Sequence, residues 1–497
     1  MTPLYNIAAV REAESAALAR RAHAPFSLMR MAGLAVADAA RKMITKKKPT
    51  ALILAGPGNN GGDALVAAAA LQKHHWRVDA VLCQKPAQPD ALRALRLWKE
   101  SGGKTITAES LTSGDLDIAK YDIIIDGIFG IGGKRPLSGK YAKVAKAANT
   151  AAAKVLAIDI PSGINADTGG GGECIMATQT ITFFANKPGL HTGKGAAASG
   201  EVITCTLGEK MTSAPDGMMI NAIGDINFSH LRRQKDGHKG DYGNICFIGG
   251  DDGMTGALAL AARACIRLGG GKVRAAPLCQ NPPAFDTAAP EVMWQKPPVT
   301  AKQYSVIAIG TGLGKSAAAK KSMTQMTISA AASSIPIVAD ADGLNILAAD
   351  DKLRQKFAAR PGAKVITPHP AEAARLLKCT TTKVQNNRIA AAIALAKQTN
   401  AQTALKGAGT IMASPNGEWQ LCGGGNPGLA QGGSGDILTG MIAALLAQTK
   451  DAAFAMRAGC YLHAAAADQM AKEGGGYIGM DINAIAAAAA TIINRAL

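Results

Sequence analysis

The sequence predicts an α/β protein built from two domains, and three observations support this prediction. The chain has 497 residues, whereas one domain usually holds about 100 to 200. Short apolar runs rich in Val and Ile alternate with longer alanine-rich segments, which is the pattern of parallel strand–helix–strand units. Gly208–Asn227 lacks any sustained periodicity. We therefore expect one domain in residues 1–215 and a second in residues 226–497.

The apolar runs mark the expected strands in order along the chain. They are Ala51–Gly56, Tyr121–Gly127 and Val155–Ile160 in the first half, then Ile245–Gly250, Val306–Gly310, Ile335–Asp340 and Val365–Pro368 in the second. Gly or Asp stands at or beside the end of most runs. Because parallel sheets bind ligands beyond the carboxyl ends of their strands, each domain is expected to carry one site there.

The charge balance favours anionic partners. Lys and Arg number 54 against 36 Asp and Glu, which gives a formal net charge of +18. The basic residues are mostly scattered, and aromatic residues make up only 4% of the chain. The sequence lacks the interleaved basic and aromatic residues that stack on bases. We therefore expect no nucleic acid as a partner.

The cysteines and the hydropathy pattern indicate the cellular compartment in which the protein resides. The nine cysteines have no paired spacing, which indicates reduced thiols rather than disulfides or a zinc site. The first residues carry charges at short intervals and lack the apolar core of a signal peptide. No run reaches the roughly 18 apolar residues of a membrane span. We expect a cytoplasmic protein with no membrane association.

Three turns with potential ligand groups follow the strands expected in the first half. Ala55–Asp63 (AGPGNNGGD) opens a helix expected to start near Ala64, and its glycines and helix N-terminus suit a phosphate. Asp126–Gly139 adds a carboxylate and a basic loop, and Asp159, Ser162 and Asp167 follow the third strand. Parallel neighbours share one edge, so these groups can converge. Capping or turn formation is the alternative for each residue alone.

Together with Phe183–Gly195 (FFANKPGLHTGKG), these strings resemble the NAD(P)H-hydrate epimerase domain over nearly all of residues 1–210. The resemblance implies a Rossmann-like three-layer sandwich that interconverts the R and S forms of hydrated NADH and NADPH. It implies a potassium ion held by Asn60, Asp126 and Ser162, whose oxygen atoms suit a hard cation. The implied hydrate-binding residues are Asn59, Asn60, Gly61, Gly62, Asp63, Gly130, Ile131, Gly132, Gly133, Lys134, Arg135, Pro136 and Asp159.

Asp159 is the candidate acid/base of this first site. Inverting C6 of the hydrate requires moving a proton to or from its hydroxyl while the ring nitrogen supplies electrons, and a strand-end carboxylate can do this. Ile131 and Gly133 depart from a loop that usually contains threonine. These departures spare the proposed acid.

The second half has its strongest signal in Gly425–Gln448 (GNPGLAQGGSGDILTGMIAALLAQ), where glycines precede a carboxylate and an apolar helix. In Gly432–Asp436 the backbone N–H groups and the helix N-terminus can surround a phosphate, and Asp436 is placed as a base. A capped helix after a flexible turn is the alternative. The turn resembles that of ribokinase-like small-molecule kinases, whose acidic residue deprotonates the acceptor hydroxyl.

Further strings narrow this resemblance. They are His238–Gly250, Met254–Ala257, Thr311–Gly314, Asp340–Asn345, Thr367–Glu372 and Leu405–Thr410. In this order they resemble the ADP- or ATP-dependent NAD(P)H-hydrate dehydratase over roughly residues 226–497. The resemblance implies a ribokinase-like three-layer sandwich that dehydrates the S form at the expense of ADP or ATP. Magnesium that bridges nucleotide oxygens is the expected cation.

The same resemblance assigns binding residues. It implies that the adenine nucleotide is bound by Lys406, Gly407, Ala408, Gly409, Thr410 and Gly435, and that the hydrate contacts Ala257, Gly314, His369 and Asp436. An ordinary turn role is the alternative for His369, which stands between two prolines. Departures from the family strings at Thr311, Gly343 and Gln431 bear on affinity more than on reaction type.

Two other functions compete with repair of hydrated cofactor. One is a vitamin or sugar kinase fused to a dinucleotide-binding module, because GGSGD alone does not exclude it. The strings HKGDYG, DADGLN and TPHPAE speak against that kinase. The other is a non-catalytic nucleotide sensor or nucleic-acid binder, and the carboxylates Asp159 and Asp436 on ligand-facing loops oppose it. The resemblance also suggests ADP as the nucleotide and a homo-oligomeric assembly.

Overall fold

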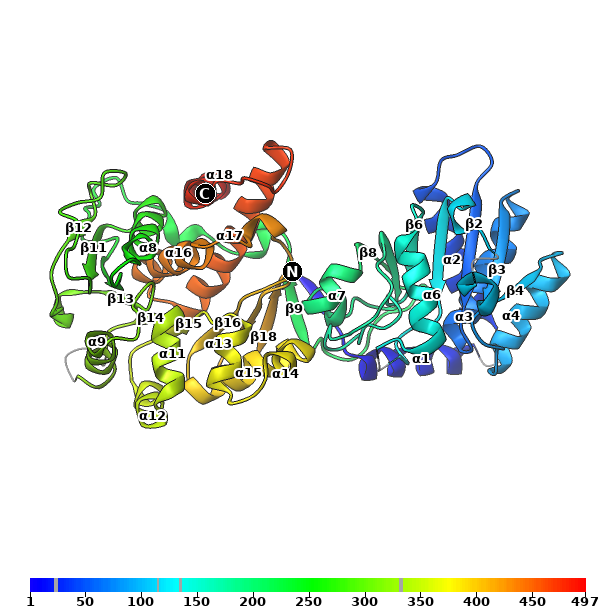
Figure 1. Cartoon of the computed structure of the whole chain (residues 1–497), viewed down its shortest axis with the longest axis horizontal. Coiled ribbons are helices and arrows are strands. Elements are labelled where there is room, and N and C mark those ends of the chain that lie inside the picture. Colours follow the sequence, from blue (N-terminus) through cyan, green and yellow to red (C-terminus); the bar gives the residue numbers. More distant parts are fainter. Residues whose placement is uncertain (22–25, 114–115, 134–135, 330–333) are drawn as a thin grey trace. The chain divides into compact units, whose positions relative to one another are not determined.

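The computed structural model describes residues 1–21, 26–113, 116–133, 136–329 and 334–497. The chain forms two compact units, Thr2–Gly217 and Met218–Leu497. Each unit has a largely parallel central sheet with helices on both faces (Figure 1). The predicted α/β class is therefore confirmed.

The sheet of the N-terminal unit is wholly parallel, with the order β4-β3-β2-β5-β6-β7-β8. Central strand β2 is buried on both faces, because Ile53 joins one apolar cluster while Leu52 and Leu54 join another. Such a strand is a continuous apolar run in the sequence. The strands of this unit are β1 (Thr2–Leu4), β2 (Thr50–Ala55), β3 (Arg77–Leu82), β4 (Thr105–Thr107), β5 (Ile123–Gly127), β6 (Lys154–Ile158), β7 (Gln179–Phe183) and β8 (Glu201–Cys205).

Helices cover both faces of this first sheet. α2, α3 and α4 pack over the face that carries Ile53, and α5 and α6 pack over the opposite face. The sheet is thus the middle of three layers. The helices are α1 (Ile7–Arg20), α2 (Ser27–Met43), α3 (Asn59–Lys73), α4 (Pro89–Glu100), α5 (Ala108–Thr112), α6 (Gly139–Thr150) and α7 (Gly193–Ala198).

The sheet of the C-terminal unit has the order β9-β18-β17-β16-β15-β14-β13-β10-β11-β12. Neighbours are parallel from β12 to β16, and β16, β17 and β18 form antiparallel pairs. The strands are β9 (Gly217–Ile220), β10 (Asn244–Gly249), β11 (Lys272–Pro277), β12 (Met293–Trp294), β13 (Val306–Ile309), β14 (Ile337–Ala339), β15 (Lys364–Ile366), β16 (Gln402–Leu405), β17 (Ile411–Ala413) and β18 (Trp419–Cys422).

Helices again form the outer layers. α8, α16, α17 and α18 share one apolar cluster on one face of the sheet, and the remaining helices lie along the other face (Figure 1). Their bounds are α8 (Thr255–Arg267), α9 (Ala317–Ile328), α11 (Ala341–Ala349), α12 (Asp351–Ala359), α13 (Pro370–Leu376), α14 (Thr381–Asn386), α15 (Arg388–Thr399), α16 (Ser434–Thr449), α17 (Ala452–Glu473) and α18 (Ile485–Ala496).

Every apolar run that the sequence analysis expected to be a strand forms one, namely β2, β5, β6, β10, β13, β14 and β15. Other strands were missed because polar residues interrupt them. In β7, Thr180 and Thr182 are completely buried. The Thr180 hydroxyl donates to the Ser199 carbonyl at 2.7 Å, and this bond offsets the cost of burying a hydroxyl. A search for apolar runs does not find such a strand.

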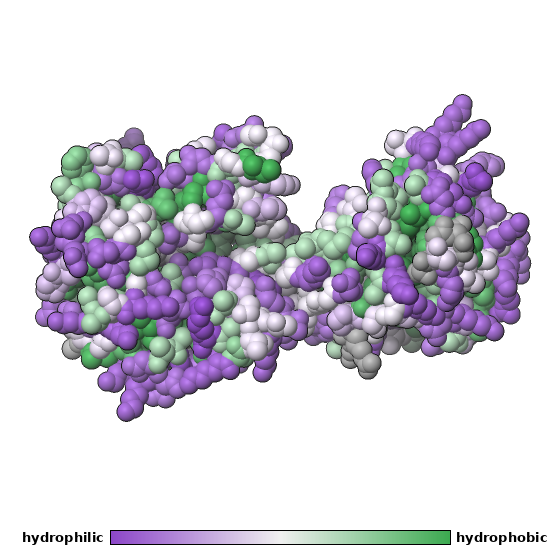
Figure 2. Space-filling model, viewed as in Figure 1, coloured by the Kyte–Doolittle hydropathy of each residue, from purple (hydrophilic) through white to green (hydrophobic). Residues whose placement is uncertain are grey.

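The remaining global features concern the surface and the thiols. No helix in the described part of the chain is long and apolar enough to cross a membrane. The face drawn in Figure 2 is largely hydrophilic, with apolar residues scattered over it. All nine cysteines are free thiols. Burial raises the pKa of Cys246 to about 12 and that of Cys422 to about 11, so both stay protonated and unreactive at neutral pH.

Close packing of α16 on α8 predicts an effect on stability. A Cβ atom at Gly440 of α16 would lie 2.1 Å from the Ala261 carbonyl oxygen of α8. Gly440→Ala must push the helices apart, and we expect it to lower the free energy of unfolding of the C-terminal unit by about 1–3 kcal/mol. Urea unfolding followed by circular dichroism measures this loss.

Gly256→Ala is the matched control on α8, because nothing lies within 4 Å of a Cβ atom at Gly256. It should change the free energy of unfolding by less than about 0.5 kcal/mol. Equal stabilities of Gly440→Ala and Gly256→Ala would contradict the close packing.

Candidate active sites

Asn59–Asp63 form the first turn of α3, so this helix begins earlier than the expected start near Ala64. The glycines explain the difference. A Cβ atom at Gly61 would lie 2.0 Å from the Gly56 carbonyl oxygen, so only glycine lets the helix start directly against the end of β2. The positive end of the helix dipole is thereby placed at the strand ends, where it favours an anionic ligand.

Asp126 lies at the end of β5 and is completely buried. Its two carboxylate oxygens accept hydrogen bonds from Ser162 Oγ at 2.7 Å and Ser162 N at 2.8 Å, and Ile128 N donates at 3.2 Å. Burial outweighs these bonds and raises the pKa of Asp126 to about 6. Asp126 and Ser162, which the sequence placed on separate strands, are therefore in direct contact.

Asn60 presents an unsatisfied amide close to these groups. Its side chain is buried, and within the described ranges its Nδ2 has no hydrogen-bond partner. A Cβ atom at Gly130 would lie 3.0 Å from Asn60 Oδ1 and 3.4 Å from Asp159 Oδ2, so the Gly130 loop brings Asn60 and Asp159 together. Buried polar groups are normally satisfied. The oxygen atoms of Asn60, Asp126 and Ser162 are of the kind that binds a hard cation, whereas the unpaired Nδ2 of Asn60 is a donor that requires an acceptor.

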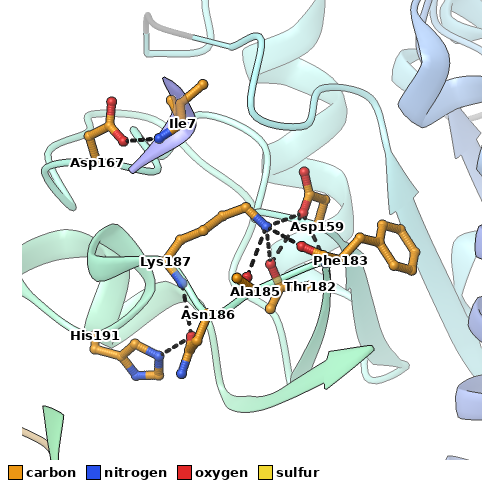
Figure 3. A network of polar contacts seen from close by, with 9 residues as sticks. All are labelled: Ile7, Asp159, Asp167, Thr182, Phe183, Ala185, Asn186, Lys187 and His191. Atoms are coloured by element: carbon orange, nitrogen blue, oxygen red, sulfur yellow. Dashed lines mark hydrogen bonds and ion pairs between the residues drawn. The ribbon is translucent and has the colours of Figure 1, made fainter. Parts of the chain in front are cut away.

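Asp159 follows β6 and pairs with Lys187, whose Nζ lies 2.7 Å from Asp159 Oδ1 (Figure 3). The Lys187 side chain is completely buried. Sequence reasoning missed Lys187, because lysine is almost always solvated. The signal was present, since Lys187 lies within the string Phe183–Gly195.

The negative charge of Asp159 acts on two more carboxyl groups, those of Glu14 and Asp63. Burial raises the pKa of Glu14 on α1, and the charge of Asp159 raises it further, whereas Arg11 and Lys187 oppose this effect. Burial also raises the pKa of Asp63 well above its usual value, with added repulsion from Asp159 and Glu14. Glu14 was not predicted, because it lies on a helix that precedes every strand considered.

The other predicted residues of the first site are placed as follows. Asp167, from the turn after β6, accepts a hydrogen bond from Ile7 N at 2.7 Å at the start of α1 (Figure 3), which is a capping role. Lys134 and Arg135 lie outside the described residues. The loop around them is partly or fully exposed at Ile131, Gly132, Gly133 and Pro136.

Asp436 stands in the first turn of α16 in the second site. Gly433 precedes this helix with a φ of 93°, a conformation that favours glycine. Burial raises the pKa of Asp436 to about 7. The negative charges of Asp340 and Asp342 act in the same direction, and Lys406 opposes them. Asp436 can therefore take or release a proton near neutral pH.

Lys406 and Asp340 form an ion pair beside Asp436. Lys406 Nζ lies 2.7 Å from Asp340 Oδ1, and Thr439 Oγ1 donates to Asp340 Oδ2 at 2.8 Å. Burial lowers the pKa of Lys406, but nearby carboxylates, with Asp340 first, outweigh burial and raise it overall. A Cβ atom at Gly435 would lie 3.2 Å from Lys406 Nζ. The structure thus brings together Lys406, Gly435 and Asp436.

The loop Lys406–Thr410 joins β16 to β17, and hydrogen bonds from Arg388 hold the start of this loop in place. Gly407 has a φ of 141°, and a Cβ atom there would lie 2.9 Å from Arg388 Nη2. Arg388 is buried and donates to the carbonyls of Leu405 and Lys406 at 3.0 and 3.1 Å. Burial lowers the pKa of Arg388 to about 10, so it stays charged. Sequence reasoning did not find this support.

Ala257 and Gly314 lie on facing segments. A Cβ atom at Gly312 would lie 3.2 Å from Ala257 Cβ, and Gly314 N donates to Asp342 Oδ2 at 2.9 Å. Gly314 has a φ of 74°, and its added Cβ atom would lie 2.5 Å from Asp251 Oδ2. The backbone of this turn is therefore pressed closely between α8 and α11.

His369 begins α13, where it caps the helix. Its Nδ1 accepts from Ala371 N at 3.1 Å, and Glu372 Oε2 accepts from His369 N at 2.8 Å. The turn role left open by the sequence is therefore present. The ring is 47% exposed, and its contact with hydrate stays a prediction.

Comparison with known proteins assigns the family. A family model described as NAD(P)H-hydrate dehydratase matches residues 245–490, and one described as YjeF-related protein N-terminus matches residues 25–189. The bifunctional NAD(P)H-hydrate repair enzyme Nnr of Coxiella burnetii is 35% identical over 491 residues, which cover 96% of each chain. The chain belongs to the bifunctional NAD(P)H-hydrate repair enzymes.

Other members of this repair-enzyme family match at similar levels. The Leishmania major protein is 36% identical and covers 95% of this chain and 90% of its own. The Escherichia coli protein is 35% identical and covers 84% of this chain and 80% of its own. The two units of this chain correspond to the epimerase and dehydratase domains of the family.

Solved structures also resemble part of the repair enzyme. A ribokinase-like superfamily protein from Enterococcus faecalis is 25% identical with a TM-score of 0.48, covering 56% of this chain and 96% of its own. The ADP/ATP-dependent NAD(P)H-hydrate dehydratase from Bacillus subtilis, co-crystallised with ATP/Mg²⁺, is 25% identical with a TM-score of 0.45, covering 55% and 99%.

Burial of Asp126 predicts a pH dependence of stability. Its pKa is about 6 in the folded chain, against an ordinary value of 3.8 for an aspartate. The stability it contributes is fully present below pH 4 and is lost as pH rises through about 6, by up to about 3 kcal/mol. In potassium-free buffer, Asp126→Asn should therefore remove this loss, as measured by urea unfolding at pH 5 and pH 8.

The exposed carboxylate of Asp38 supplies the control, because its side chain is 64% exposed. Asp38→Asn should keep the pH dependence of the wild type. An identical pH dependence in Asp126→Asn and Asp38→Asn would show that Asp126 ionises normally in the folded chain.

Proposed function

We propose that this chain returns hydrated NADH and NADPH to the active cofactors. The N-terminal unit interconverts the R and S forms at C6, and the C-terminal unit dehydrates the S form at the expense of ADP or ATP. The observation that carries the proposal is Asp436, a carboxyl group with a pKa of about 7 at the N-terminus of α16, beside the Lys406–Asp340 pair. A base of this kind suits removal of a hydroxyl proton near neutral pH.

Asp159 is the acid/base of the proposed epimerisation. As the ring nitrogen supplies electrons and the C6 hydroxyl leaves as water, the hydroxyl must receive a proton. Water then adds to the other face of C6 and gives that proton back. Asp159 Oδ2 faces the Asn60 and Gly130 region, and burial raises the pKa values of the nearby carboxyl groups of Glu14 and Asp63.

Asn60, Asp126 and Ser162 are proposed to hold potassium in the same unit. Their amide, carboxylate and hydroxyl oxygens match the preference of a hard cation. When bound, this ion supplies positive charge that favours the ionised form of Asp126 and helps to fix an anionic substrate. It would thereby offset the cost of burying the Asp126 carboxylate.

In the proposed dehydration, Asp436 takes the proton of the C6 hydroxyl while the oxygen attacks the terminal phosphoryl group of the nucleotide. The products of this step are the phosphorylated hydrate and AMP or ADP. Phosphate then leaves C6 with the electrons of the C–O bond, the ring nitrogen supplies the electrons that replace them, and a proton is lost from C5. The dihydropyridine is restored. Lys406 and the N–H groups of Gly433–Gly435 stabilise the phosphoryl charge.

Magnesium is proposed to enter with the nucleotide. Asp340 is bonded to Lys406 and Thr439, and Glu372 is bonded to His369. Among the described residues, no group of three or more His, Cys, Asp or Glu side chains suits a metal ion. Nucleotide oxygens would therefore supply most of its ligands, as is usual for magnesium. A cytoplasmic location and a homo-oligomeric assembly stay predictions.

The deciding experiment mixes purified protein with both NADH-hydrate epimers and follows the return of reduced-nicotinamide absorbance, with ADP, with ATP or with neither. We expect complete, nucleotide-dependent recovery from both epimers. Recovery that stops after one epimer would contradict the epimerase assignment. Absence of any recovery would favour a small-molecule kinase.

Substitution of the two acids should separate the activities. Asp159→Asn should lower the kcat of epimerisation by about 100-fold or more and leave dehydration of the S form intact, because general acid–base catalysis contributes about that much. Asp436→Asn should show the opposite pattern while still binding nucleotide. Separate assays on purified R and S forms measure both rates, and loss of both activities in either variant would contradict the division between the units.

The pH dependence of dehydration should report Asp436. Because the ionised carboxylate is the active form, kcat/KM should fall as pH drops below about 7. Asp342→Asn removes one negative charge that raises this pKa, so the acidic limb should move to lower pH. The exposed control Asp38→Asn should leave the limb in place, and an unmoved limb in Asp342→Asn would exclude Asp436 as the titrating base.

A further inference from the structure

Strands β6 and β7 both end in unusual three-residue turns. Asp159 has a φ of 66°, and Ile160 N donates across it to Ile158 O at 2.8 Å. Phe184 has a φ of 62°, and Ala185 N donates across it to Phe183 O at 2.8 Å. Three-residue turns with a positive φ at the centre are rare and strained, and each such non-glycine residue costs about 1–3 kcal/mol. Something in the structure must hold both turns in place.

Lys187 joins these two turns. Its Nζ donates to Asp159 Oδ1 at 2.7 Å, to the Phe183 carbonyl at 2.9 Å and to the Ala185 carbonyl at 3.3 Å (Figure 3). Thr182 Oγ1 accepts a fourth contact at 2.6 Å. The lysine side chain is completely buried. One ammonium group thus links the carboxylate of the first turn to two carbonyls of the second.

The same contacts make the two oxygens of Asp159 unequal. Lys187 Nζ, Thr182 Oγ1 and Phe183 N all donate to Oδ1, at 2.7, 3.1 and 3.2 Å. Oδ2 instead lies toward Gly130, where an added Cβ atom would lie 3.4 Å away. A carboxylate held by one oxygen presents the other in a fixed direction, and fixed direction is a large part of catalytic efficiency.

Charge adds a second role for the lysine. The charges of Asp159, Arg11 and Lys187 act on Glu14, and those of Asp159 and Glu14 act on Asp63. Repulsion between three carboxyl groups disfavours full ionisation. The direct bond from Lys187 to Asp159 Oδ1 places a positive charge next to this carboxyl group.

We infer that Lys187 is the positioning residue of the epimerase site, which holds the two strained turns together and directs Asp159 Oδ2 as the oxygen that exchanges a proton with the hydrate. The inference rests on the proposed epimerisation by Asp159. A lysine that only stabilised the fold would affect the amount of folded protein. A positioning lysine affects kcat and its pH dependence in the folded protein.

The test measures epimerisation of purified R-form NADH hydrate at several pH values. Lys187→Met should lower kcat about tenfold or more, change KM less than about twofold, and move the pH profile of kcat to higher pH. Thr182→Val removes one donor to Asp159 and one acceptor of Lys187, so it should shift the same quantities in the same direction by less. Dehydration of the S form by the C-terminal unit of the same molecules reports the amount of protein, and urea unfolding followed by circular dichroism reports whether the N-terminal unit is folded.

Lys194→Met is the matched control, because Lys194 is exposed on α7 a few residues after Lys187. It should behave as the wild type in every measurement. Wild-type kcat and an unmoved pH profile in folded Lys187→Met would overturn the inference. Should Lys187→Met fail to fold, wild-type kcat and pH profile in Thr182→Val would overturn it. Absence of epimerisation in the wild type would instead reject the proposed function.

Discussion

The parallel register of β5 with β6 is the constraint on which the first site depends. Asp126 pairs with Ala157 across these strands, so the chain after both strands emerges at one edge of the sheet. Asp126 meets Asp159 and Ser162 there, although it is far from both in the sequence. The cost of this arrangement is several carboxyl groups in a poorly hydrated space, and their partners determine the rest of the site.

The two units offset the desolvation of these carboxyl groups in a similar way. Asp159 in the first and Asp340 in the second each follow a strand, and each binds a lysine from a later loop at 2.7 Å. In both pairs the lysine follows a different strand of the sheet from the one that the carboxylate follows. Asp126 has only hydrogen-bond donors as partners, and its pKa is raised. Burial without an ion-pair partner among the described residues therefore accounts for the raised pKa of Asp126.

The sequence was sufficient for the fold class and for the strands that are apolar throughout, because burial on both faces leaves a continuous apolar run. It was also sufficient to bring Asp126 near Ser162, because both follow the ends of parallel strands, whereas the family resemblance placed Lys406 and Asp436 in one site. It was insufficient for Lys187, Arg388 and Glu14. Their importance arises from burial and from charges on distant elements, which no local pattern of residues records.

Asp436 differs from the paired acids in a way that suits its proposed chemistry. Lys406 stands close enough to oppose the rise in the pKa of Asp436, yet its short ion pair is with Asp340. A lysine bonded directly to Asp436 would hold that carboxylate in its charged form and weaken it as a base. With the lysine committed to Asp340, Asp436 keeps a pKa of about 7, while positive charge stays near the phosphate. In the second site, therefore, the carboxylate that binds the lysine is Asp340, and the proposed base is a different carboxylate, Asp436.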